Sequence, residues 1–74
     1  MINAAFIYVA PGQNPQEQKA VIPSDTLTLH VVGCSTYDQA ETAAKELVAN
    51  GCGAIELCAG FGNEGIARIK KAVG

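Results

Sequence analysis

The middle of the chain constrains the fold more than any other part, because it reads as strand, helix, strand. Residues 26–32 are rich in β-branched side chains and end at a glycine, which is typical of a buried strand. Apolar residues at helical spacing predict a helix that Ser35 or Thr36 caps and that continues through Asn50. Residues 53–59 predict a further strand. Two strands joined by a helix in one sheet almost always run in parallel, so the sequence predicts an α/β fold.

The two ends of the chain extend this pattern. Residues 4–10 form an apolar run that stops at a Pro-Gly pair, which predicts a first strand. Residues 15–20 follow a capping sequence and predict a single helical turn. A last helix opens at Asn63 or Glu64. We therefore expect a small three-stranded, mainly parallel sheet in the order strand, short helix, strand, helix, strand, helix, with an antiparallel first strand as the alternative.

The chain of 74 residues is long enough for one domain, which we place at residues 1–74. Its net charge is −2, and its five basic residues form no run or stripe that could neutralise phosphates. We expect no nucleic-acid partner. The N-terminus has no positively charged leader, and the apolar runs are far below membrane-spanning length. We expect no membrane partner and a cytoplasmic location.

Cys34, Cys52 and Cys58 are an odd number of cysteines, and their spacing matches no zinc pattern. The chain has one histidine, His30, to assist them. We interpret the three as reduced thiols and expect no disulfide within the chain, no metal and no cofactor. A reactive Cys34 or Cys58 is the alternative to two inert, buried side chains.

Two segments carry a resemblance to a known family. Residues 54–65 read AIELCAGFGNEG, and residues 5–12 read AFIYVAPG. Together they resemble a family of short, uncharacterised bacterial and archaeal proteins, classed as a domain of unknown function, whose most specific part is an I-E-L-C-x-G-F-G block. The resemblance covers nearly the whole chain and implies a similar domain, but it implies no activity. It also implies that relatives continue with one more apolar strand.

Alternation of side chains along the three expected strands predicts two different sheet faces. One face is aliphatic and suits the two helices. The other would carry a mid-strand carboxylate, Glu56, which is costly to bury without a partner. We expect Glu56 to be buried and hydrogen-bonded, with His30 as its natural partner. The members of this second face are Phe6, Tyr8, Thr28, His30, Glu56 and Cys58.

The glycine-rich segment 60–65 spells G-x-G-x-x-G between a strand and a helix. Free amides at a helix N-terminus attract anions, so this turn could bind a small anionic ligand. Dinucleotide binding is disfavoured, because the motif follows the third strand, Glu64 would repel phosphate, and the acidic ribose partner would lie beyond residue 74. The alternative is a tight turn whose glycines serve only the backbone.

Three functions follow, in order of preference. The first is a binding module for a small molecule or anion, with its site at the C-terminal ends of the strands, around Tyr8, Gly60, Gly62 and Asn63. The second is a homo-oligomer, most simply a homodimer, whose under-covered sheet face is the interface. The third is a small enzyme that uses Glu56 and His30, with Cys58 as a further catalytic candidate.

Overall fold

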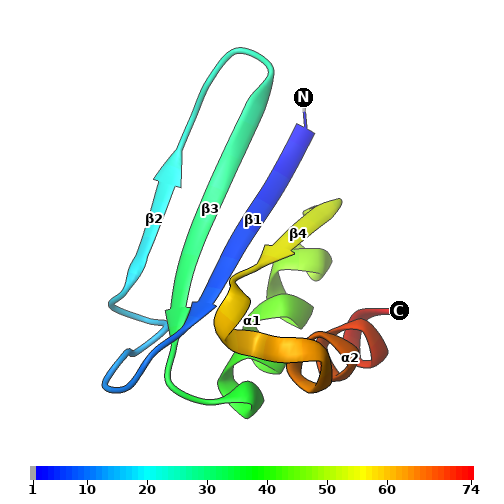
Figure 1. Ribbon diagram of the computed structural model, residues 1–74. Helices are drawn as coiled ribbons and strands as arrows, with labels where there is room; N and C mark the ends of the chain where they lie inside the picture. Colours follow the sequence, from blue (N-terminus) through cyan, green and yellow to red (C-terminus); the bar gives the residue numbers. More distant parts are fainter. Residues whose placement is uncertain (1) are drawn as a thin grey trace.

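The computed structural model describes residues 2–74, which form one four-stranded sheet and two helices (Figure 1). The strands are β1 (Ile2–Val9), β2 (Lys19–Ile22), β3 (Leu27–Cys34) and β4 (Ala54–Leu57), and the helices are α1 (Tyr37–Ala49), the 3-10 turn η1 (Ala59–Phe61) and α2 (Gly62–Val73). The sheet order is β2-β3-β1-β4. β1 runs parallel to β3 and β4, and β2 runs antiparallel to β3. The predicted α/β class and mainly parallel sheet are confirmed.

The expected three-stranded sheet is wrong in one respect, because the segment before β3 adds a fourth strand. Residues 15–17 form a turn, in which the Asn14 side chain accepts a hydrogen bond from the Gln16 amide at 2.9 Å. The chain then leaves this turn as β2 instead of continuing as a helix. The side chain of Ser24 bonds the backbone of Leu27 and closes the β2–β3 hairpin. A four-residue strand at a sheet edge is too short to show a periodic pattern.

Helix α1 begins and ends where the sequence predicts. Thr36 is its N-cap, and the Thr36 hydroxyl accepts a hydrogen bond from the Gln39 amide at 3.1 Å. Gly51 follows the helix with a φ of +96°, a conformation that costs glycine little. The buried side of α1 is made of alanines, which lets the helix lie close to the sheet. Neither helix within residues 2–74 has the length and apolar character to cross a membrane.

The hydrophobic core lies between the sheet and the two helices. Its largest fully buried side chains are Phe61, Ile7 and Cys34. The Tyr37 ring stacks on Phe61 with centroids 5.7 Å apart, and its hydroxyl donates to the Phe61 carbonyl at 2.9 Å. These contacts join the start of α1 to the turn before α2, so one aromatic pair closes that end of the core.

Arg68 links the two helices at the surface. Its guanidinium lies over the Tyr37 ring, 5.5 Å from the centroid, and bonds Asp38 at 2.5 Å. It also forms an ion pair with Glu41. The hydrogen bond from Arg68 to Asp38 is the largest cause of a raised Arg68 pKa, so the guanidinium stays charged at any ordinary pH.

The strand register separates two faces of the sheet. In β1, Ala5 and Ile7 point toward the helices, and their partners in β3 are His30 and Val32. We call this side the covered face. Phe6, beside Val31 and Glu56, belongs to the other side, which no part of residues 2–74 packs over. We call that side the open face. Its members are Ile2, Ala4, Phe6, Tyr8, Ala20, Ile22, Leu27, Leu29, Val31, Gly33, Ala54 and Glu56.

The register corrects the predicted face of His30. The sequence placed His30 beside Tyr8 and Glu56, whereas the structure places it on the covered face beside Ala5. Leu27, Leu29 and Val31 make the open side of β3 the more aliphatic one, so alternation within this strand indicated the wrong side for the helices. The strand extends to Cys34, and the burial of this residue sets the orientation of the whole strand.

Candidate functional site

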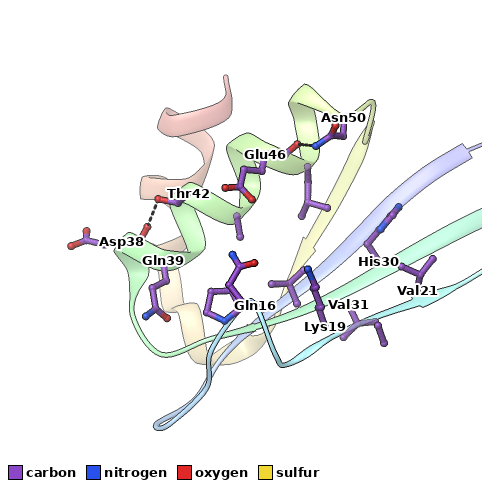
Figure 2. Close-up of a pocket in the computed structure, with 15 residues that line it drawn as sticks. Gln16, Lys19, Val21, His30, Val31, Asp38, Gln39, Thr42, Glu46 and Asn50 are labelled. Carbon is purple, nitrogen blue, oxygen red and sulfur yellow. Dashed lines mark hydrogen bonds between the residues drawn. The ribbon is translucent and has the colours of Figure 1, made fainter.

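A groove of about 690 Å³ lies between α1 and the strands β2 and β3 (Figure 2). It exists because α1 packs over β1 and β3, and α2 packs against α1 on the side away from β2. The helix side of β2 therefore has no helix above it. The groove is a consequence of covering a four-stranded sheet with two helices.

The floor of the groove is apolar. Val32 and Ala43 are each 8% exposed and belong to the hydrophobic core. Leu47, from α1, packs against that core and also faces the groove. Val21 on β2 is 56% exposed, so it offers a large apolar surface at the outer side. An apolar floor of this kind favours a ligand with a hydrocarbon part.

The sheet side of the groove carries two nitrogen-bearing side chains, Lys19 and His30. Register places them on neighbouring strands, since Val21 pairs with His30 and Lys19 pairs with Val32. The His30 side chain is half-buried, and among residues 2–74 neither it nor Lys19 makes a side-chain hydrogen bond or ion pair. Their donors are thus available to an acceptor group on a ligand.

The helix side of the groove carries carboxylate and amide groups. Gln39 and Glu46 are seven residues apart, so they lie on one side of α1. The Ser35 amide donates to the Gln39 side-chain oxygen at 2.7 Å, which leaves the Gln39 NH₂ group free to donate. Asn50 is held in the opposite sense, because its NH₂ group donates to the Glu46 carbonyl at 2.8 Å, which leaves its side-chain oxygen to accept. Figure 2 shows Gln39 and Glu46 across the groove from Lys19 and His30.

The loop after β1 closes one end of the groove with Pro15 and Gln16. Side chains at the C-terminal ends of the strands fix this loop. The Tyr8 hydroxyl donates to the Gln13 side-chain oxygen at 2.9 Å, and the Ser35 hydroxyl donates to the Gln13 carbonyl. The groove is therefore bounded by a helix, a strand pair and an anchored loop.

Glu56 lies elsewhere and is exposed. The prediction that it is buried and hydrogen-bonded is wrong, since its carboxylate makes no side-chain hydrogen bond within the described residues. It lies on the open face beside Phe6, on the edge strand β4. A carboxylate there stays in water and needs no partner.

The three catalytic candidates occupy three separate places. Glu56 is on the open face, and His30 is on the covered face, so the expected pair does not form. Cys58 follows β4 and packs against the core, and its amide donates to the Ile7 carbonyl at 3.1 Å. The structure brings no two of these residues together as an acid–base or nucleophile–base pair.

The predicted ligand-binding residues line neither this groove nor the smaller apolar cavity beside β4. Tyr8 covers Gly33 on the open face. Gly60 and Gly62 form the turn into α2, where Gly62 has a φ of +61°, and Asn63 is exposed. The turn is shorter than the predicted residues 60–65, because α2 already begins at Gly62. The affinity of this segment for an anion stays a prediction.

The cysteines are free thiols with different surroundings. Burial raises the pKa of the Cys34 thiol above its usual value, which disfavours the reactive thiolate. The Cys52 thiol lies 3.3 Å from the Ala54 carbonyl. Within residues 2–74, no three His, Cys, Asp or Glu side chains are grouped as metal ligands.

Sequence reasoning missed the groove because it missed β2. Without this strand, Lys19 and Val21 have no assigned position, and the surface beside α1 is not visible as a cavity. The available signal was the apolar pair Val21-Ile22 directly before a Pro-Ser-Asp turn and a β-branched segment. That pattern is typical of a short hairpin strand.

Comparison with known proteins gives one match. The model of a family described as a family of unknown function (DUF6506) matches residues 2–74. No curated protein and no solved structure matches the chain significantly. The match covers both the groove and the open face.

Proposed function

The chain belongs to the DUF6506 family, whose function is unknown, and we propose that it binds a small organic molecule in the groove between α1 and the β2–β3 hairpin. The observation that carries this proposal is an apolar floor between two polar sides whose groups are free. Lys19 and His30 lie on one side and Glu46 on the other. Binding sites for small molecules usually combine an apolar lining with a few such groups.

The lining indicates the chemistry of the ligand. A volume of about 690 Å³ suits a metabolite-sized molecule. An acceptor such as a carboxylate or phosphate group would bind Lys19 and His30, and a donor such as an amine or hydroxyl group would bind Glu46. The hydrocarbon part would contact Val21 and Leu47. We also place this activity in the cytoplasm, because three free thiols suit a reducing compartment.

Residues 60–65 offer a second, weaker binding site for an anion. Their amides precede and begin α2, where the positive end of the helix dipole favours negative charge. Glu64 in the first turn of α2 opposes this attraction. The groove is therefore the preferred site. The enzyme alternative loses its support, because Glu56, His30 and Cys58 are apart.

The test is a screen of amino acids, monocarboxylates and phosphate monoesters by thermal shift, followed by amide NMR on the compounds that raise Tm. We expect shifts at residues 39–50, which comprise most of α1 and its C-cap, and in β2. Lys19→Met and Glu46→Gln should each weaken binding about tenfold or more, as expected for loss of a charge-assisted hydrogen bond.

Lys45→Met is the matched control, because Lys45 is an exposed residue of α1 that does not line the groove. It should bind the same compounds with unchanged affinity. Shifts confined to the amides of residues 60–65 would move the site to that turn. A screen in which no compound perturbs the groove amides would contradict the proposal.

A further inference from the structure

We propose that the open face of the sheet is an interface to a second copy of this chain. The face is apolar across all four strands, and it carries large exposed side chains. Ile2 is 59% exposed and Ile22 is 56% exposed. Phe6, Leu29 and Val31 between them are only half-buried. This inference is independent of the groove, which lies on the opposite side of the sheet.

A bare face is unusual for this type of sheet. Sheets built mainly from parallel strands are almost always covered on both sides. Here β1 pairs in parallel on both of its edges, yet within residues 2–74 nothing packs over its Phe6 side.

The open face carries very little charge, and this indicates which kind of partner it fits. Glu56 is its single charged residue among those described, and it lies on the edge strand β4. The rest of the face offers aliphatic and aromatic groups. A nucleic acid or a charged peptide would find no complementary charge there. A second open face, which has the same apolar centre, is complementary to the first.

The size of the face is sufficient for a stable dimer. The four strands contain 24 residues. At about 3.3 Å per residue and 4.8 Å between strands, they project onto roughly 380 Å². Side-chain relief increases this area, so pairing two faces would bury on the order of 1,000–1,500 Å² in total, within the range of specific interfaces.

Glu56 also selects the orientation of the pair. If the two-fold axis ran across the strands, β4 would lie over β4 and the two Glu56 carboxylates would approach each other. If the axis runs along the strands, β4 of one copy lies over β2 of the other, and β1 lies over β3. The two carboxylates then sit at opposite rims in water. We infer the second arrangement, with Phe6 over the β3 strand of the second copy.

The chain has a physical reason to pair in this way. Apart from Phe61, Ile7 and Cys34, its fully buried side chains are alanines. A core of this size gives marginal stability in a domain of 74 residues. Covering Phe6, Leu29 and Ile22 would supply a second apolar layer.

The test uses two neighbouring residues of β2 that are equally exposed but lie on opposite faces. Val21 and Ile22 are each 56% exposed, and Ile22 lies on the open face. Sedimentation equilibrium of the wild-type chain at 1–100 µM should give about 15 kDa, twice the chain mass of 7.6 kDa. Ile22→Glu should raise the dimer Kd at least tenfold, and Val21→Glu should leave it unchanged.

A second measurement locates the interface without relying on a variant. In a mixed sample of labelled and unlabelled wild-type chains, NOEs between chains should connect Phe6 ring protons with Leu29 and Val31 methyl groups. A wild-type monomer at 100 µM would overturn the proposal, and it would leave the face to a different partner. A dimer that Ile22→Glu does not weaken, or whose NOEs lie along the β4 edge, would also overturn it.

Discussion

The covered and open faces of the sheet are built from similar residues but differ in what lies over them. On the covered face, Ala5, Ile7 and Cys34 are fully buried. On the open face, Ile2 and Ile22 are more than half exposed. Hydrophobic composition therefore does not determine burial in this chain. The number and position of the helices determine it.

The helices also explain why the covered face is incomplete. Alanines at positions 40, 43 and 44 bring α1 close to the sheet over β1 and β3. No equivalent helix lies over β2, so the same face provides both the core and the groove. The two faces thus present two different surfaces, a groove with polar sides and an apolar plane.

The largest expected effect is a loss of stability on replacing Phe61, which contrasts with the effect of replacing Phe6. Phe61 is fully buried in the core, and Phe6 is half-buried on the open face. Phe61→Ala should cost about 3–5 kcal/mol, which is most of the stability that a chain of this size has. Chemical unfolding followed by circular dichroism at low micromolar concentration should show a chain that is largely unfolded without denaturant.

Phe6→Ala should behave differently, because it removes contacts that form mainly in the dimer. The wild-type Tm should rise with protein concentration, and Phe6→Ala should reduce this dependence. A wild-type Tm that is the same at 5 and 200 µM would contradict this prediction, because it would show that no dimer covers Phe6.

A smaller effect is expected from Gly33, which Tyr8 covers on the open face. A Cβ atom at Gly33 would lie 2.4 Å from the Tyr8 ring and 2.5 Å from its hydroxyl oxygen. Gly33→Ala should therefore displace the ring, break its bond to Gln13 and cost about 1–3 kcal/mol in urea unfolding.

Gly53→Ala is the matched control for Gly33. A Cβ atom there would meet nothing within 4 Å, and the change should alter the free energy of unfolding by less than about 1 kcal/mol. In the double variant Gly33→Ala with Tyr8→Ala, the clash is absent and the two costs should not add. Simple additivity would show that the ring does not constrain position 33.

The smallest effect is a pH dependence from Cys34 on the covered face. Burial raises the pKa of this thiol in the folded chain, whereas the unfolded thiol ionises near its ordinary pKa of 9.0. As pH rises, the unfolded state loses the proton first, so the folded state loses stability above the unfolded pKa. The free energy of unfolding should be unaffected by this group at pH 7 and should fall above pH 9, by at most about 1.4 kcal/mol per pH unit.

Cys34→Ala should remove this part of the alkaline slope, and Cys58→Ala should retain it. Urea unfolding between pH 7 and pH 10 measures both. Equal slopes for the wild-type chain and Cys34→Ala would mean that the thiol is not buried in the folded state.

The sequence predicted the elements with strong local signals. Helix α1 has a threonine cap, a stripe of apolar residues and a terminal glycine, and all three act within the helix itself. The strand runs of β1, β3 and β4 were identified for the same reason. The glycines of residues 60–65 correctly marked the junction before the last helix, but the turn is shorter than predicted, because α2 already begins at Gly62.

The parts that were missed depend on contacts between distant segments. β2 exists because it pairs with β3, and its four residues carry little local signal. The face of His30 depends on the register between β1 and β3, which alternation within one strand cannot give. The Glu56–His30 pair was predicted because His30 was assigned to the wrong face. The groove was not predicted because β2 forms one of its sides.

The most direct test measures both dimerisation and ligand binding in variants of two neighbouring residues. Val21 lines the groove, and Ile22 lies on the open face, with equal exposure. Each variant is measured by sedimentation equilibrium and by affinity for a compound that binds the wild-type groove. We predict that Ile22→Glu lowers the mass to that of a monomer and keeps the affinity, whereas Val21→Glu keeps the dimer and weakens binding. Variants that lose both properties together, or neither, would contradict the separation of the two faces.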